Sequence, residues 1–108
     1  MGALPVRKAS PLTKEAQKFK SHIDTLITKM QKETKFTPTR AQLEECAEMI
    51  LDYINQNHSK IAPHTSYLKA AIIDLTEVPQ MSPQMQRISF LTSLKDASKN
   101  IELFTSCI

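Results

Sequence analysis

The chain contains a single glycine, Gly2, among its 108 residues. Tight β-hairpin turns, glycine-rich phosphate loops and the sharp turns that present catalytic nucleophiles all depend on glycine, so the sequence disfavours them. Proline marks the boundaries instead, and four of the six prolines precede stretches of helical periodicity: Pro11, Pro38, Pro63 and Pro83. Because the fixed φ of proline suits the first turn of a helix, the sequence predicts four helices and no sheet.

In each stretch, apolar residues recur every three or four positions and so predict one buried helix face. These faces run over residues 12–30, 43–54 and 67–78, and in the fourth helix, which begins at Ser82-Pro83, over 85–104. The fourth face is predicted to carry Met85, Ile88, Leu91, Leu94, Ala97, Ile101 and Phe104. The third stretch is the most apolar, and we expect that helix to lie centrally and to end at Val78-Pro79.

The second helix has two candidate starts. Thr37 precedes Pro38, whereas Thr39 has Gln42 three residues later, the pair that forms a capping box. The polar run 55–60 is interpreted as the frayed end of this helix followed by a loop.

The loops between the four helices are short, which predicts that sequential helices pack antiparallel. We therefore expect an all-α, compact up-and-down four-helix bundle over residues 12–108, with residues 1–11 as a flexible N-terminal lead-in. Two helical-repeat hairpins are the alternative, but the intervals between helix-start prolines are uneven and no residue pattern recurs.

Composition narrows the class of protein further. No apolar run approaches the roughly 18 residues that span a bilayer, and the N-terminus lacks the apolar core of a secretory signal. Cys46 and Cys107 are too few for a disulfide scaffold, and Cys46 falls on an apolar helix face. We expect an intracellular protein, cytoplasmic or nuclear, with a disulfide between the two cysteines left open.

Metal binding and catalysis find little support in the sequence. The three histidines, His22, His58 and His64, show no pairing with i, i+4 spacing and no Glu-x-x-His motif. Glu44, Glu45 and Glu48 cluster off the apolar face of the second helix, where their position near a helix start explains them. We expect no catalytic, cofactor-binding or metal-binding residues, and a protein that is not an enzyme.

A basic stripe is the strongest surface feature. At 100° per residue, one side of the first helix carries Lys14, Lys18, His22, Lys29 and Lys32. With a net charge of +3 and a pI near 9.0, this stripe suits nucleic-acid phosphates or acidic lipid. The stripe carries no aromatic residue for base stacking, so this function is the second hypothesis.

The first hypothesis is a non-catalytic docking or scaffold domain that binds a partner helix or a short linear motif in an interhelical groove. Methionines and off-stripe apolar residues are the candidate contacts: Met81, Met85, Phe90, Leu103 and Ile108. Self-association of the bundle is a third possibility. Ser10, Thr37 and Ser82 each precede proline and are candidate phosphorylation sites at helix starts.

Overall fold

The computed structural model describes residues 11–77 and 83–108, and the regular structure in these ranges is entirely helical. Helix α1 spans Pro11–Lys32, α2 spans Arg40–Ile61, α3 spans Thr65–Thr76 and α4 spans Pro83–Cys107. A 3-10 turn at Ala62–His64 joins α2 to α3. The chain is therefore all-α across its described part, as the sequence predicts.

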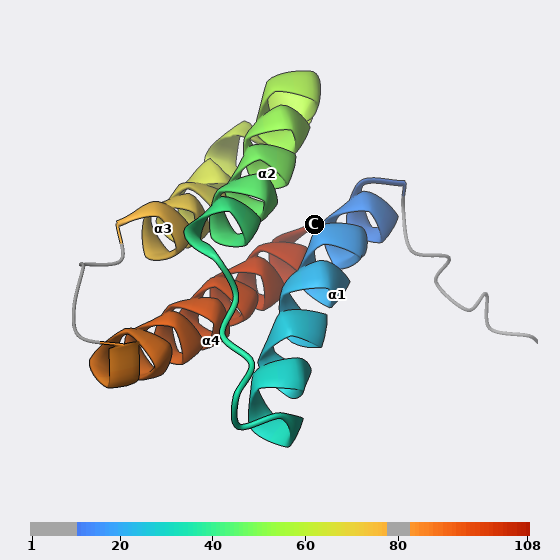
Figure 1. Cartoon of the computed structure of the whole chain (residues 1–108). Helices are drawn as coiled ribbons and strands as arrows, with labels where there is room; N and C mark the ends of the chain where they lie inside the picture. Colours follow the sequence, from blue (N-terminus) through green and yellow to red (C-terminus); the bar gives the residue numbers. More distant parts are fainter. Residues whose placement is uncertain (1–10, 78–82) are drawn as a thin grey trace, which may run out of the picture.

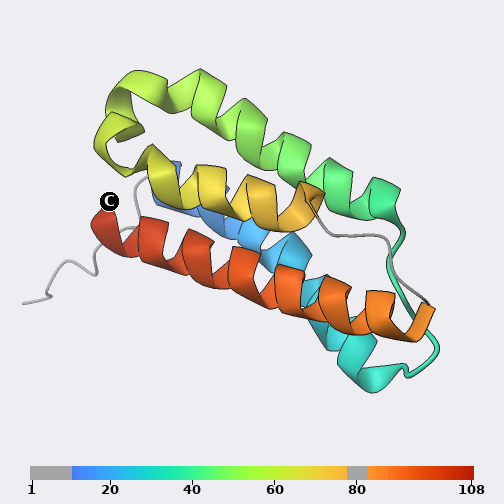
Figure 2. The same ribbon diagram turned by 90° about the vertical axis from the view of Figure 1, so that its left-hand side faces the viewer.

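Successive helices run in opposite directions (Figure 1). Seen from the side, the starts of α1 and α3 and the ends of α2 and α4 lie at the same end of the bundle (Figure 2). Each helix packs against two neighbours, and α1 packs along α4, which closes the ring. This closure makes the molecule an up-and-down four-helix bundle rather than an open row of hairpins.

Local signals place the helix ends close to their predicted positions. Pro11 and Pro83 are the first residues of α1 and α4. At α2, Thr39 Oγ1 accepts a hydrogen bond from the Gln42 amide at 3.2 Å, and Gln42 Oε1 accepts one from the Thr39 amide at 2.8 Å. The predicted capping box is confirmed, and it makes Thr39 rather than Thr37 the N-cap.

The predicted loop at residues 55–60 is wrong, because α2 continues to Ile61. Asn57 leaves the helical region with φ −124° and ψ 15°, and its side-chain amide donates to the Tyr53 carbonyl at 3.0 Å. The helix resumes after this kink and buries Ile61 completely, seven positions after the buried Ile54. Burial of that side chain outweighs the weak helix propensity of the polar run.

The expectation that the third helix lies centrally is also wrong. Helix α3 packs against α2 and α4 and buries one face, with Leu68, Ala71 and Leu75 inaccessible to solvent. Ile73 on its other side is 53% exposed. The high apolar content of α3 comes from one buried face together with an exposed apolar residue. Its outward side stays exposed because a bundle of four helices has no fifth helix to cover it.

The core joins all four helices, and an edge-to-face chain of aromatic rings lies within it. Tyr53 of α2 stands between Phe19 of α1 and Phe104 of α4, with ring centroids 5.3 Å and 5.8 Å away. The Tyr53 hydroxyl donates to the Leu12 carbonyl at 2.8 Å. Burial, reinforced by the negative charge of Glu15, raises the pKa of Tyr53 to about 12. The tyrosine is therefore a core residue whose polar end is satisfied.

Polar contacts fasten neighbouring helices at their edges. Asn100 of α4 donates to Asp74 of α3 at 2.8 Å, and burial raises the pKa of that carboxyl group. At the other side of α4, Arg87 Nη2 donates to the Met30 carbonyl in the last turn of α1. A guanidinium at the C-terminal end of a helix satisfies a carbonyl that has no partner within the helix and complements the helix dipole.

Candidate functional site

The residues that the sequence predicts as a docking surface on α4 do not form one. Phe90 is only 2% exposed, so it is a core residue and not a docking contact. Met85, Leu103 and Ile108 are exposed, but Met85 and Leu103 are separated by 18 positions, about 27 Å along the helix. Met81 lies outside the described residues, as do Ser10, Ser82 and Val78-Pro79.

The rotation of α4 explains this correction. Its buried line, Phe90-Leu94-Ala97-Ile101-Phe104, alternates spacings of four and three. Ile88 was predicted on this line, yet it is 64% exposed, as Met85 is at 55%. Ile88 and Phe90 project about 160° apart on a helix, so they cannot both face the core. The larger aromatic residue, in line with the rest of the buried stripe, takes the interior.

A shallow groove of about 210 Å³ lies instead between α2 and α3. Its lining consists of Glu44, Ala47, Glu48 and Leu51 from α2 and of Ile72 and Thr76 from α3. The α2 residues share one side of the helix because they are spaced three or four positions apart, and the same holds for the two α3 residues. The apolar side chains that α2 and α3 contribute thus leave a groove open at the surface between the two helices.

Apolar side chains are exposed on α2 and α3 here, as they are on α4. Leu51 is 47% exposed within it, and Ile73, next to Ile72 on α3, is 53% exposed. The Glu44 and Glu48 carboxylates line the same groove, and no described lining residue is basic. The site therefore combines apolar surface with negative charge, a combination that fits an apolar ligand carrying positive charge.

The groove was not predicted from the sequence, because all the apolar residues of 43–54, Leu51 among them, were treated as one buried face. Ile50 and Leu51 are adjacent and so project about 100° apart. Leu43, Ile50 and Ile54 are all buried and define the direction of the core. A stricter projection of α2 from these residues would have left Leu51 at the edge of the buried face.

The predicted basic stripe is fully at the surface. Its five members, Lys14, Lys18, His22, Lys29 and Lys32, are all exposed along α1. Lys29 Nζ lies 4.4 Å from the ring centroid of Phe36, which packs against the core. A depression of about 500 Å³ over this side is lined by Ser21, Asp24, Thr25, Thr28, Lys29, Lys32 and Glu33. All of them belong to α1 or directly follow it, so the depression is shallow and lies on a convex face.

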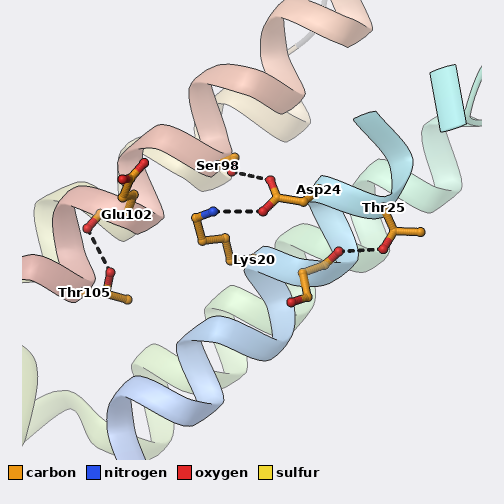
Figure 3. A network of polar contacts seen from close by, with 7 residues as sticks. Lys20, Asp24, Thr25, Ser98, Glu102 and Thr105 are labelled. Atoms are coloured by element: carbon orange, nitrogen blue, oxygen red, sulfur yellow. Dashed lines mark hydrogen bonds and ion pairs between the residues drawn. The ribbon is translucent and has the colours of Figure 1, made fainter. Parts of the chain in front are cut away.

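A third, polar hollow of about 320 Å³ lies between α1 and α4. Its described lining is Gln17, Lys20, Ser21, Asp24, Glu102 and Thr105. Asp24 stands at its centre and receives hydrogen bonds from Lys20 Nζ at 2.8 Å and from the Ser98 hydroxyl at 2.5 Å (Figure 3). Because this carboxylate already accepts hydrogen bonds from two donors, we interpret it as a structural contact between α1 and α4 and not as a catalytic base.

Metal binding and thiol reactivity are the remaining chemistries that these residues could support. In ranges 11–77 and 83–108, no three histidine, cysteine, aspartate or glutamate side chains lie close enough to hold a metal ion together. Both cysteines are free, Cys46 buried and Cys107 exposed. Burial, with the negative charge of Glu45, raises the pKa of the Cys46 thiol to about 11, so this thiol is poorly nucleophilic.

No helix in the described part of the chain has the length and apolar character that a bilayer crossing requires. Comparisons with protein-family models, with characterised proteins and with solved structures found no match for this chain.

Proposed function

We propose that this domain is a non-catalytic docking module that binds a short, basic, amphipathic segment of a partner protein in the groove between α2 and α3. The observation that carries the proposal is the exposure of Leu51, 47%, inside an interhelical groove lined by Glu44 and Glu48. Exposed apolar surface costs free energy that association with an apolar partner recovers.

The size of the groove favours a peptide over a small-molecule cofactor. Its volume of about 210 Å³ is below the roughly 300–1,000 Å³ typical of small-molecule pockets. Such a groove accepts one or two side chains of a helical segment, as when residues at i and i+3 or i+4 anchor an amphipathic helix. Leu51 and Ile72 offer the apolar contacts for those anchors.

The negative charge beside the groove indicates which charge the proposed partner carries. Helix α2 exposes four acidic residues, Glu44, Glu45, Glu48 and Asp52. Lysine or arginine residues beside the apolar anchors would complement this surface, speed association and fix the orientation of the segment. A partner with acidic flanks would be repelled, so the proposed ligand is both apolar and basic.

The proposed setting is the interior of a cell, in the cytoplasm or nucleus. Free thiols at Cys46 and Cys107 support this setting, since such thiols persist in reducing compartments. The proposed role also requires no cofactor.

Selection from a displayed library of random peptides tests the proposal. We expect the full chain to enrich peptides with paired apolar anchors at helical spacing and with flanking lysine or arginine. Leu51→Gln should weaken the affinity of an enriched peptide at least about tenfold, roughly 1.4 kcal/mol. Glu44→Gln with Glu48→Gln should weaken it less and reduce its salt dependence.

The matched control is Met85→Gln with Ile88→Gln, which alters exposed apolar residues of α4 and should leave the affinity unchanged. Loss of binding in this control alone would move the site to α4 and overturn the proposal. Failure to enrich any peptide, or enrichment of peptides without basic residues, would also contradict it. Thermal unfolding of each variant establishes that the fold is intact.

A further inference from the structure

We infer that the outward side of α1 binds the surface of a bilayer rich in acidic phospholipids. This basic face comprises Lys14, Lys18, His22, Lys29 and Lys32, all exposed. The inference is independent of the α2–α3 groove and concerns a different side of the molecule.

The basic face is straight and rigid. Its five residues span positions 14 to 32 of one uninterrupted helix, about 27 Å, within a sector of about 80°. The opposite side of α1 is anchored in the core by Ala16, Phe19, Ile23, Leu26 and Met30. Because these core contacts fix the rotation of α1 about its axis, the cationic side chains all point to the same side of the molecule.

Positive charge outnumbers negative charge on and beside this face. Residues 11–33 contain three acidic residues, Glu15, Asp24 and Glu33, against five lysines. Asp24 is already ion-paired with Lys20 at 2.8 Å and accepts a hydrogen bond from the Ser98 hydroxyl at the border with α4. Ser21 and Thr28 lie beside the lysines and are also exposed, so they add hydroxyl groups that can donate hydrogen bonds to phosphate oxygens.

The chemistry of the face favours a lipid surface over nucleic acid. The row of side chains from Lys14 to Lys32 is straight and roughly 27 Å long. A planar array of phosphates can contact all of these side chains at once. The strands of a duplex wind away from such a row, and the face has no arginine to read bases through a bidentate contact. It offers no aromatic ring for a single strand either, since the Phe36 ring lies under Lys29 and packs against the core.

The remaining charges orient the domain on such a surface. The exposed acidic residues of α2 are repelled by acidic lipid, which favours contact through α1 alone. Helices α1 and α3 lie on opposite sides of the bundle, α3 on the left in Figure 1 and in front of α1 in Figure 2. A domain bound through α1 therefore keeps the side formed by α3 away from the lipid.

Co-sedimentation of the full chain with vesicles tests this inference. We expect binding to phosphatidylcholine vesicles that contain roughly one-third phosphatidylserine, no binding to pure phosphatidylcholine, and release at about 0.5 M salt. Lys14→Glu with Lys18→Glu should reduce the partition coefficient at least about 30-fold, since each lysine near an acidic surface contributes about 1 kcal/mol, roughly a fivefold factor. A negative charge at position 14, in the first turn, also suits the helix dipole, so the variant should fold.

The matched control is Lys60→Glu with Lys69→Glu, which makes the same change in net charge at the end of α2 and on α3. It should alter the partition coefficient less than about threefold, because those residues belong to α2 and α3 and lie outside the basic face of α1. Equal loss in both variants would show a non-specific charge effect and overturn the inference. Binding to a labelled RNA or DNA but not to vesicles would overturn it in favour of nucleic acid, and binding to neither would show that the face is merely solvated.

Discussion

The Ser98 hydroxyl of α4 donates a hydrogen bond of 2.5 Å to a carboxylate oxygen of Asp24 on α1. The second oxygen of that carboxylate accepts from Lys20, one turn earlier on α1, at 2.8 Å. Ser98 is buried at 9% exposure, and so the two helices share a charge-assisted hydrogen bond at the border of the core. Such a bond fixes how far α1 and α4 can slide past each other.

Removing this contact should destabilise the bundle. We expect Ser98→Ala to lower the free energy of unfolding by about 1.5–3 kcal/mol, the range for hydrogen bonds to charged groups. A double-mutant cycle with Asp24→Ala, measured by urea unfolding, should give a coupling energy above about 0.5 kcal/mol. Ser66→Ala, at an exposed serine of α3, is the control. Additive effects of the two substitutions would show that the bond contributes nothing.

The rotation of α4 can be tested with two apolar residues of that helix. Phe90→Ala should cost about 3–5 kcal/mol because it leaves a cavity in the core. Ile88→Ala, at a side chain 64% exposed, should change the free energy of unfolding by less than about 0.5 kcal/mol. Chemical denaturation of both variants provides the comparison, and a larger cost at Ile88 would mean that the helix is rotated the other way.

Stability should fall at alkaline pH because of Tyr53. The pKa of this phenol is raised from about 10 to about 12 by burial, so the folded state keeps its proton where the unfolded chain loses it. The stabilising contribution is complete below pH 10 and is lost as pH rises through 12, a change of roughly 2–3 kcal/mol.

Tyr53→Phe isolates this effect from the titration of lysines in the same pH range. The variant lacks the hydrogen bond to the Leu12 carbonyl and should be less stable than the native chain by about 1 kcal/mol at pH 8. The deficit should shrink and then reverse in sign as pH rises from about 10 through about 12, because the native chain loses more than the initial difference; urea unfolding at fixed pH follows it. A deficit independent of pH would contradict the raised pKa.

The two thiols should differ sharply in reactivity. A thiol reagent at pH 8 should modify the exposed Cys107 at once and Cys46 only as the chain unfolds. The pKa of Cys46, raised to about 11, and its complete burial both suppress the thiolate. In Cys107→Ser the rapid phase should vanish, whereas a rapid phase of two thiols in the native chain would show that the core around Cys46 opens easily.

Sequence periodicity determined the helical class, the number of helices and most of their boundaries. The reason is local: proline at a first turn, the pair Thr39 and Gln42, and apolar spacing act within a few residues along the chain. The exposure of the basic face could also be predicted from helical periodicity, because residues on the side of a helix opposite its apolar stripe face the solvent.

Only the tertiary structure decided which of two overlapping apolar lines on α4 faces inward, and that α2 extends past Asn57 to bury Ile61. The groove between α2 and α3 also depended on it, since a groove exists where two separate helices leave Leu51 and Ile72 incompletely covered. Helix rotation and spacing result from the packing of all the core side chains together, and no single segment of sequence contains that information.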